Sequence, residues 1–120
     1  MKKILITGGS GFLGKNLALS LFNKKKYKIF LCSRNIENLR QASISTGCDF
    51  YPLNINSTDS LLDAFNHIKP DIVIHSAATK YVDLSENFPE ECIETNINGS
   101  INILRISELF RVKQLIVIST

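Results

Sequence analysis

The sequence predicts an α/β fold in which a doubly wound parallel sheet carries helices on both faces. Short, continuous apolar runs alternate with segments whose apolar residues recur at helical spacing, a pattern typical of strands buried on both faces and their crossover helices. A glycine-rich stretch at residues 8–14 lies directly between the first apolar run and the first helical segment. Right-handed crossovers then place five strands in the order 3-2-1-4-5.

Local patterns set the position of each element. The strands are expected at residues 4–6, 27–32, 48–55, 71–75 and 115–118, and the helices at about 13–22, 37–44, 58–68 and 89–110. Ser57 or Thr58 is expected to cap the third helix, Pro70 to end it, and Gly47 to cap the end of the second helix in the left-handed conformation. The expected apolar faces are Leu13, Leu17, Leu21 and Phe22 in the first helix, Leu61, Leu62, Phe65 and Ile68 in the third, and Ile93, Ile97, Ile101 and Leu104 in the last.

Length and composition exclude several classes of protein. The chain has 120 residues, of which 44% are hydrophobic, so we predict one domain over residues 1–120. Six glycines and three prolines are too few for a low-complexity chain. Three cysteines without CxxC spacing predict buried thiols rather than a disulfide framework or a metal site. Because no stretch approaches the roughly 20 apolar residues of a membrane span, we expect a cytoplasmic protein.

Charge is spread unevenly along the chain. Residues 1–40 hold nine Lys or Arg and one acid, whereas residues 41–120 hold five basic and ten acidic residues. This asymmetry fits an anionic ligand near the N-terminus or has no functional meaning. The cluster at 24–28 ends the first helix at the opposite edge of the sheet from the glycines, so we interpret it as solvated surface and predict no nucleic-acid partner.

The glycine stretch has the spacing of a dinucleotide-binding loop. Gly8, Gly11 and Gly14 fit Gly-x-x-Gly-x-x-Gly between a strand and a helix. Such glycines permit a tight turn, close approach of the backbone to a pyrophosphate and close helix packing, while the helix N-terminus offers N–H groups to the anion. The sequence therefore predicts a Rossmann-type fold with a cofactor held by Gly8, Ser10, Gly11, Phe12, Leu13 and Gly14.

A phosphate-binding P-loop is the competing interpretation of the same residues. Gly9, Gly14 and Lys15 match most of that motif, but Asn16 follows where Ser or Thr should bind Mg²⁺. We therefore favour the dinucleotide loop and predict no metal.

The residues after the second strand bear on the choice of cofactor. In NAD-binding folds an acid at this position accepts hydrogen bonds from the ribose 2′-OH, but here Ser33 and Arg34 occupy it and the first acid is Glu37. Arg34 could pair with a 2′-phosphate through its planar guanidinium, and Ser33 could donate its hydroxyl. The sequence favours NADP, with NAD as the alternative.

Three later motifs extend the pattern over the whole chain. They are HSAA at 75–78, ETNINGS at 94–100 and VIST at 117–120. Because it carries these motifs and the glycine loop, the chain resembles an extended short-chain dehydrogenase/reductase of the epimerase/dehydratase superfamily acting on nucleotide sugars. The resemblance implies that Ser76, Ala77 and Ala78 line the nicotinamide ribose, that Asn54 and Ile55 contact adenine, and that Asn96 and Thr120 belong to the catalytic set.

Shorter matches point to a subgroup. GKN at 14–16 and AATKYV at 77–82 look like the inverting UDP-N-acetylglucosamine 4,6-dehydratases of capsular polysaccharide biosynthesis, in which Lys80 would contact the sugar nucleotide. YVDLS at 81–85 also resembles dTDP-glucose 4,6-dehydratases, although that group carries an acid after the second strand. His75 is interpreted as a hydrogen-bonded core histidine and His67 as solvated.

The family's Tyr-x-x-x-Lys pair is absent from these 120 residues, since no tyrosine has a lysine four positions later. We therefore expect this chain to be the N-terminal part of a longer enzyme, truncated after the fifth strand and inactive by itself. The full-length enzyme is expected to act as a homo-oligomer on a nucleotide sugar. The alternatives are a non-catalytic NAD(P)-binding regulatory module, a 4-epimerase or a 4-keto-sugar reductase.

Overall fold

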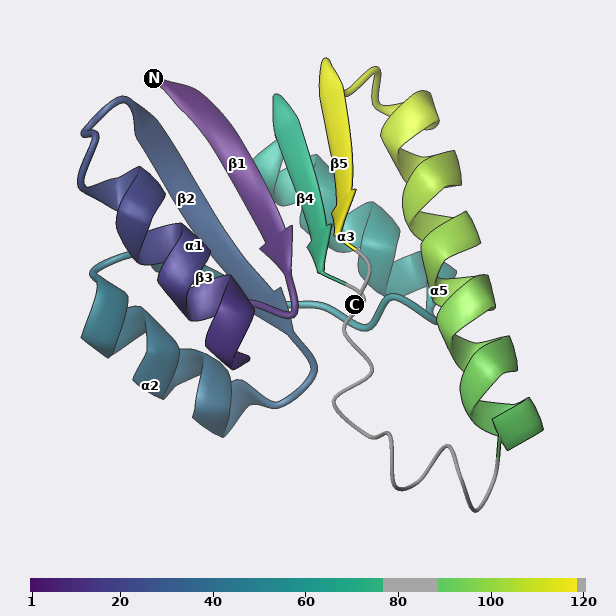
Figure 1. The fold of residues 1–120 in the computed structure, drawn as a ribbon. Helices are drawn as coiled ribbons and strands as arrows, with labels where there is room; N and C mark the ends of the chain where they lie inside the picture. Colours follow the sequence, from purple (N-terminus) through teal and green to yellow (C-terminus); the bar gives the residue numbers. More distant parts are fainter. Residues whose placement is uncertain (77–88, 119–120) are drawn as a thin grey trace.

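Five parallel strands alternate with helices in the computed structural model (Figure 1), which describes the backbone of residues 1–76 and 89–118 and the side chains of residues 1–76 and 98–118. The strands are β1 (Lys2–Thr7), β2 (Tyr27–Ser33), β3 (Asp49–Pro52), β4 (Ile72–Ser76) and β5 (Gln114–Ile118). The helices are α1 (Phe12–Phe22), α2 (Ile36–Thr46), α3 (Thr58–Ile68) and α5 (Pro89–Leu109).

The sheet has the order β3-β2-β1-β4-β5, which confirms the predicted topology. Strand β1 occupies the centre, where Ile4 pairs with Ile29 on one side and Ile72 on the other. All the strands run parallel, so their carboxyl ends lie at one edge of the sheet, where the loops after β1, β2 and β3 begin (Figure 1).

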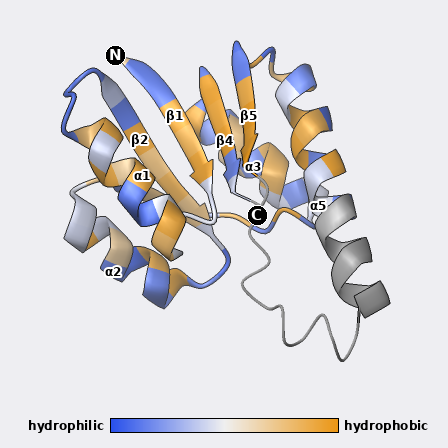
Figure 2. Ribbon diagram, in the orientation of Figure 1, coloured by the Kyte–Doolittle hydropathy of each residue, from blue (hydrophilic) through white to orange (hydrophobic). Residues whose placement is uncertain are grey.

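Two apolar cores lie on opposite faces of the sheet. Alternate residues of β1 point to different faces: Leu5 joins a cluster with α3 and α5, whereas Ile4 and Ile6 join a cluster with α1 and α2. Figure 2 shows the strands as largely hydrophobic, as expected for strands covered on both sides. This three-layer packing confirms the doubly wound α/β class.

Several predicted caps are present. Gly47 ends α2 with a φ of +79°, and the Ser57 hydroxyl accepts a hydrogen bond from the Ser60 N–H at the start of α3. Helix α2 begins one residue earlier than predicted because the Asn35 side chain accepts a bond from the Asn38 N–H. Strand β3 is shorter than predicted and ends at Pro52, which has no N–H to extend the ladder.

Two predicted apolar faces were partly wrong. In α1 the buried residues are Gly14 and Ala18, while Leu13 and Phe22 are exposed. Small residues let this helix approach the sheet closely, so the larger side chains lie at its flanks. In α5 the buried apolar residues include Ile103 and Ile106 rather than Ile101 and Leu104. The face predicted for α3 is confirmed: Leu61, Phe65 and Ile68 are buried and Leu62 is half-buried.

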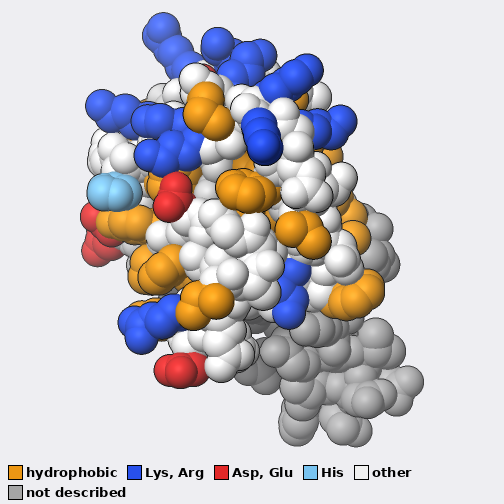
Figure 3. Space-filling view, turned by 90° about the vertical axis from the view of Figure 1, so that its left-hand side faces the viewer, with side chains coloured by type: hydrophobic (Ala, Val, Ile, Leu, Met, Phe, Trp, Pro, Cys, Tyr) orange, Lys and Arg blue, Asp and Glu red, His pale blue; other side chains and the backbone are white. Residues whose placement is uncertain are grey.

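Basic side chains gather at the edge where the strands begin (Figure 3). Lys24, Lys25, Lys26 and Lys28 are exposed there, at the opposite edge from the glycine loop, as predicted. Cys32 and Cys48 are buried free thiols; Cys92 lies outside the residues whose side chains are described. No helix in the described ranges is both long enough and apolar enough to cross a bilayer.

Candidate cofactor site

The glycine loop joins β1 to α1 at the carboxyl edge of the sheet. Gly8 has a φ of +68°, and a Cβ atom there would lie 2.9 Å from the Ser76 carbonyl oxygen. A Cβ atom on Gly14 would lie 2.5 Å from the Gly8 carbonyl oxygen. Both positions therefore require glycine, one for its backbone conformation and both for close backbone approach.

Gly9 is a third such position, which the Gly-x-x-Gly spacing does not include. Its N–H donates to the Cys32 carbonyl oxygen at 3.2 Å, and a Cβ atom there would lie 2.8 Å from Leu31 Cβ. The loop is thus packed directly onto β2 as well as β4. Contact with the neighbouring strands therefore accounts for Gly8 and Gly9, and close packing within the loop accounts for Gly14.

The N-terminus of α1 has the properties of an anion-binding site. Gly11 is the N-cap residue, no side chain caps the helix, and the first turn has no acid. The first backbone N–H groups of the helix therefore lack the partner that a Ser or Asp cap supplies. Of the other predicted loop residues, Ser10 precedes the N-cap and is half-buried, whereas Phe12 and Leu13 open the helix with exposed side chains.

Ser33 and Arg34 follow β2 at the same edge. Arg34 is exposed, and Ser33 is half-buried with its hydroxyl 3.5 Å from the Asn35 carbonyl oxygen. The nearest acid in sequence, Glu37, is exposed in the first turn of α2. The position after β2 is therefore cationic.

The loop after β3 is fixed by hydrogen bonds. Asn54 Oδ1 accepts a bond from the Asn56 N–H at 3.0 Å, and the Asn54 N–H donates to Ser60 Oγ at 2.9 Å. Asn102 Nδ2 donates to the Ile55 carbonyl oxygen at 3.0 Å. The predicted contact of Asn54 with an adenine amine would therefore use the second lone pair of Oδ1.

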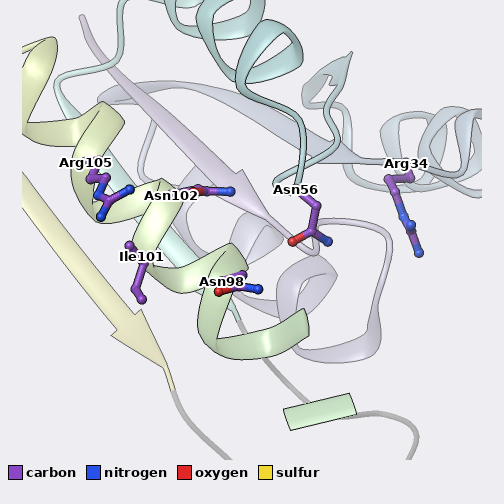
Figure 4. Close-up of a pocket in the computed structure, with 6 residues that line it drawn as sticks. All are labelled: Arg34, Asn56, Asn98, Ile101, Asn102 and Arg105. Carbon is purple, nitrogen blue, oxygen red and sulfur yellow. The ribbon is translucent and has the colours of Figure 1, made fainter. Parts of the chain in front are cut away.

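A cleft of about 630 Å³ lies between this loop, α5 and Arg34 (Figure 4). Among the residues whose side chains are described, its lining has two guanidinium groups, three amides and no carboxylate, namely Arg34, Asn56, Asn98, Ile101, Asn102 and Arg105. Figure 4 shows Asn56 between the residues of α5 and Arg34. Of these six residues, only Arg34 was predicted. The i, i+3, i+4, i+7 spacing of Asn98, Ile101, Asn102 and Arg105 is the signal that could have revealed their shared helix face.

His75 at the carboxyl end of β4 connects three elements. It is 1% exposed; its Nδ1 is 2.7 Å from Thr7 Oγ1, and its Nε2 is 3.0 Å from Ser100 Oγ. Thr7 Oγ1 also accepts the Ser76 N–H at 3.1 Å. Both ring nitrogens therefore have partners in β1 and α5, which confirms His75 as a hydrogen-bonded core residue.

The free energy of unfolding is expected to fall as the pH is lowered below about 6.5, the ordinary pKa of histidine. Burial lowers the pKa of His75 in the folded protein. The unfolded chain therefore takes up this proton at a higher pH than the folded chain, and stability is lost through that range. Urea denaturation at about pH 7.5, 6.5 and 5.5 measures the slope of stability against pH. The total loss is about 1.4 kcal/mol for each unit by which the folded and unfolded pKa values differ.

His75→Gln should flatten this slope, whereas His67→Gln should retain it because His67 is exposed on α3. Equal slopes in the wild type and the His75→Gln variant would contradict the assignment.

Of the remaining predicted site residues, the structure describes the side chain of Ser76 alone. Ser76 is half-buried at the end of β4, beside Gly8. Ala77, Ala78, Lys80 and Thr120 lie outside the described residues. Asn96 lies in α5, and its side chain is outside the description.

The Rossmann topology, the glycine turn and the uncapped helix at the carboxyl edge define the class of this protein: a dinucleotide-binding α/β domain. The residues fit such a ligand, since the helix that follows the glycine turn has neither a side-chain cap nor an acid in its first turn. Residues 4–120 match the family described as "Polysaccharide biosynthesis protein", and the chain belongs to this family.

Relatives and solved structures agree with this assignment. The chain is 38% identical to a dTDP-D-glucose 4,6-dehydratase of Dictyostelium discoideum over 100% of this chain and 29% of the relative. It is 37% identical to an inverting UDP-N-acetylglucosamine 4,6-dehydratase of Campylobacter jejuni over 99% of this chain and 36% of the relative. A crystal structure of UDP-glucose 4-epimerase from Bifidobacterium longum, in complex with NAD⁺ and UDP, aligns with a TM-score of 0.84 and 25% identity, covering 99% of this chain and 37% of that one. The chain thus spans about a third of the length of these proteins.

Proposed function

We propose that residues 1–120 form the NADP-binding domain of a nucleotide-sugar 4,6-dehydratase of the UDP-N-acetylglucosamine type, working in polysaccharide biosynthesis. The observation that carries the proposal is the tightly packed glycine turn before an uncapped helix, with Arg34 in place of an acid after β2. The Campylobacter jejuni relative supports the choice of substrate class, and the family match supports a role in polysaccharide biosynthesis.

In this proposal each strand end holds a different part of NADP. The N–H groups at the start of α1 bind the pyrophosphate, Arg34 and Ser33 bind the 2′-phosphate, and the loop at Asn54 and Ile55 contacts adenine. Residues 76–78 would line the nicotinamide ribose. When bound, NADP⁺ supplies the hydride acceptor for oxidation of the sugar.

Three further residues are proposed to act on the substrate. Lys80 would contact the nucleotide sugar, Asn96 would shape the catalytic site, and Thr120 would bond to the reacting sugar hydroxyl. The similarity to the UDP-glucose 4-epimerase structure favours 4-epimerisation as the second candidate. Incubating the intact protein with UDP-N-acetylglucosamine and UDP-glucose separates the two: a dehydratase product has lost the mass of water, whereas an epimer keeps the substrate mass. No turnover of either sugar would favour a regulatory module.

Replacing Arg34 tests the choice of cofactor. We expect wild-type protein to bind NADP at least about tenfold more tightly than NAD, and Arg34→Ala to weaken NADP binding by about 10- to 100-fold while NAD binding changes little. The reason is the loss of a charge-assisted hydrogen bond to the 2′-phosphate, of about 1.5–3 kcal/mol. Isothermal titration of the intact protein with each cofactor measures both affinities.

Arg40→Ala is the matched control, because Arg40 is an exposed arginine on α2 outside the cleft. Wild-type binding of NAD as tight as that of NADP would refute the assignment.

We further propose that α5 forms part of a homo-oligomer contact in the intact protein. Ile101, Leu104 and Leu109 are 39%, 50% and 67% exposed on this helix. Large apolar side chains exposed together are typical of interaction surfaces.

A further inference from the structure

The edge of the sheet opposite the cofactor site carries a concentration of positive charge (Figure 3). We define this cationic edge by its eight exposed basic residues: Lys2, Lys24, Lys25, Lys26, Lys28, Lys69, Arg111 and Lys113. They lie at the starts of β1 and β2 and in the turns that lead into β2, β4 and β5. Because the strands are parallel, all these segments meet at one edge.

Folding adds residues from distant parts of the chain to the local cluster at 24–28. Five of its residues come from the basic first part of the chain, and Lys69, Arg111 and Lys113 come from the part in which acids predominate. The described carboxylates that start or end elements at this edge are Asp49, Asp71 and Glu108. Asp71 is engaged within the protein, since it accepts a hydrogen bond from the Lys3 N–H at 2.9 Å. Positive charge therefore dominates the edge.

Helix dipoles account for only part of this arrangement. Helices α1, α3 and α5 end at this edge, and cations beyond a helix C-terminus are favourable. Lys24, Lys69 and Arg111 follow those helices closely. However, Lys2 and Lys28 lie within strands, and Lys113 lies immediately before β5. These three residues do not cap any helix.

The composition and shape of the edge fit a broad anionic surface. Seven of the eight residues are lysines, whose compact ammonium groups act as point charges, whereas Arg is favoured where planar groups such as bases are recognised. The residues are spread over several separate turns. Both described clefts lie elsewhere, one beside α5 and Arg34 and the other between α1 and α2.

We propose that the cationic edge docks this protein on an anionic lipid surface. Lysines and arginines near such a surface are attracted to acidic headgroups without a specific binding pocket. Docking by this edge leaves the carboxyl edge, with the glycine loop and the cleft, facing the aqueous side. The bound protein therefore keeps its cofactor site open. The proposal is independent of the cofactor and substrate assigned above.

Vesicle co-sedimentation of the intact protein tests the proposal. We expect binding to phosphatidylcholine vesicles containing about 30% phosphatidylglycerol, little binding to pure phosphatidylcholine, and release at about 0.5 M salt, where charge attraction is screened. Lys24→Gln combined with Lys113→Gln should weaken the partition onto anionic vesicles by about tenfold or more. Neither position is among the left-handed residues of these turns, Lys25, Lys69 and Arg111, so the backbone should tolerate both changes.

Arg40→Glu is the control for net charge, since it alters the charge by the same amount away from the edge. It should bind vesicles as the wild type does, and the thermal midpoints of both variants should confirm that they are folded. Absence of binding to anionic vesicles, or equal binding to neutral ones, would overturn the proposal. The proposal would also be overturned if the Arg40→Glu variant lost as much vesicle binding as the double lysine variant. It would be overturned too if a short DNA duplex, at a lower concentration than the lipid, displaced the protein from the vesicles.

Discussion

Replacing Gly14 with alanine is expected to abolish measurable NADP binding and to destabilise the fold. The new Cβ atom would lie 2.5 Å from the Gly8 carbonyl oxygen and 3.0 Å from Gly9 Cα. Both neighbours are backbone atoms of the loop, so α1 and the loop must move apart, at a cost of about 1–3 kcal/mol. This movement displaces the N–H groups that we assign to the pyrophosphate. We expect a loss of affinity of at least about 100-fold in a titration with NADP.

Gly47→Ala is the matched control. Gly47 also has a positive φ, and its added Cβ would lie 3.2 Å from the Phe22 ring, so this variant too should lose stability. Gly47 precedes β3 at the opposite edge of the sheet, and NADP affinity should therefore remain within about twofold of the wild type. Normal NADP binding by Gly14→Ala would rule out the assigned role of the loop.

Phe65→Ala is expected to lower the free energy of unfolding by about 3–5 kcal/mol. Phe65 is fully buried in α3 and belongs to the core that includes Leu5 and Val73 of the sheet and Ile103 of α5. Its ring centroid lies 5.6 Å from that of Phe110. Removing the ring leaves a cavity where α3, α5 and the sheet meet. Urea denaturation measures the change, which is a large share of the 5–15 kcal/mol typical of a domain.

Ile44→Ala provides the comparison, because Ile44 is 78% exposed on α2 and should change stability by less than about 0.5 kcal/mol. If Phe65→Ala were equally mild, the packing of α3 against the sheet would be wrong.

The strands could be located from the sequence because parallel strands buried on both faces leave continuous apolar runs, and right-handed crossovers then predicted their order. Element ends were less predictable. The extra residue at the start of α2 depends on the Asn35 cap, and the early end of β3 depends on Pro52. The buried face of α1 was predicted wrongly because we placed the large apolar side chains against the sheet. The helix instead packs closely through the small residues Gly14 and Ala18.

The glycine loop was predictable because the spacing of its glycines is complete within seven consecutive residues, although Gly8 and Gly9 also contact β4 and β2. The cleft was not, since it depends on how α5 is rotated against the loop after β3. The bond from Asn102 to the Ile55 carbonyl oxygen spans 47 residues, and Gly99 allows the helix to approach Ile55. No local pattern specifies that contact. The full extent of the cationic edge could not be predicted for a similar reason, because Lys69 and Lys113 join Lys24 only after folding.

The central position of β1 has a consequence for the order of assembly. Its partner β2 follows after one helix, but its other partner, β4, is 68 residues further along the chain: Ile4 pairs with Ile72. During synthesis from the N-terminus, the first strand made therefore has one unpaired edge until β4 emerges. Exposed apolar edges of this kind favour association between chains. We expect nascent chains that stop before residue 72 to aggregate, and those that include β4 to close the sheet.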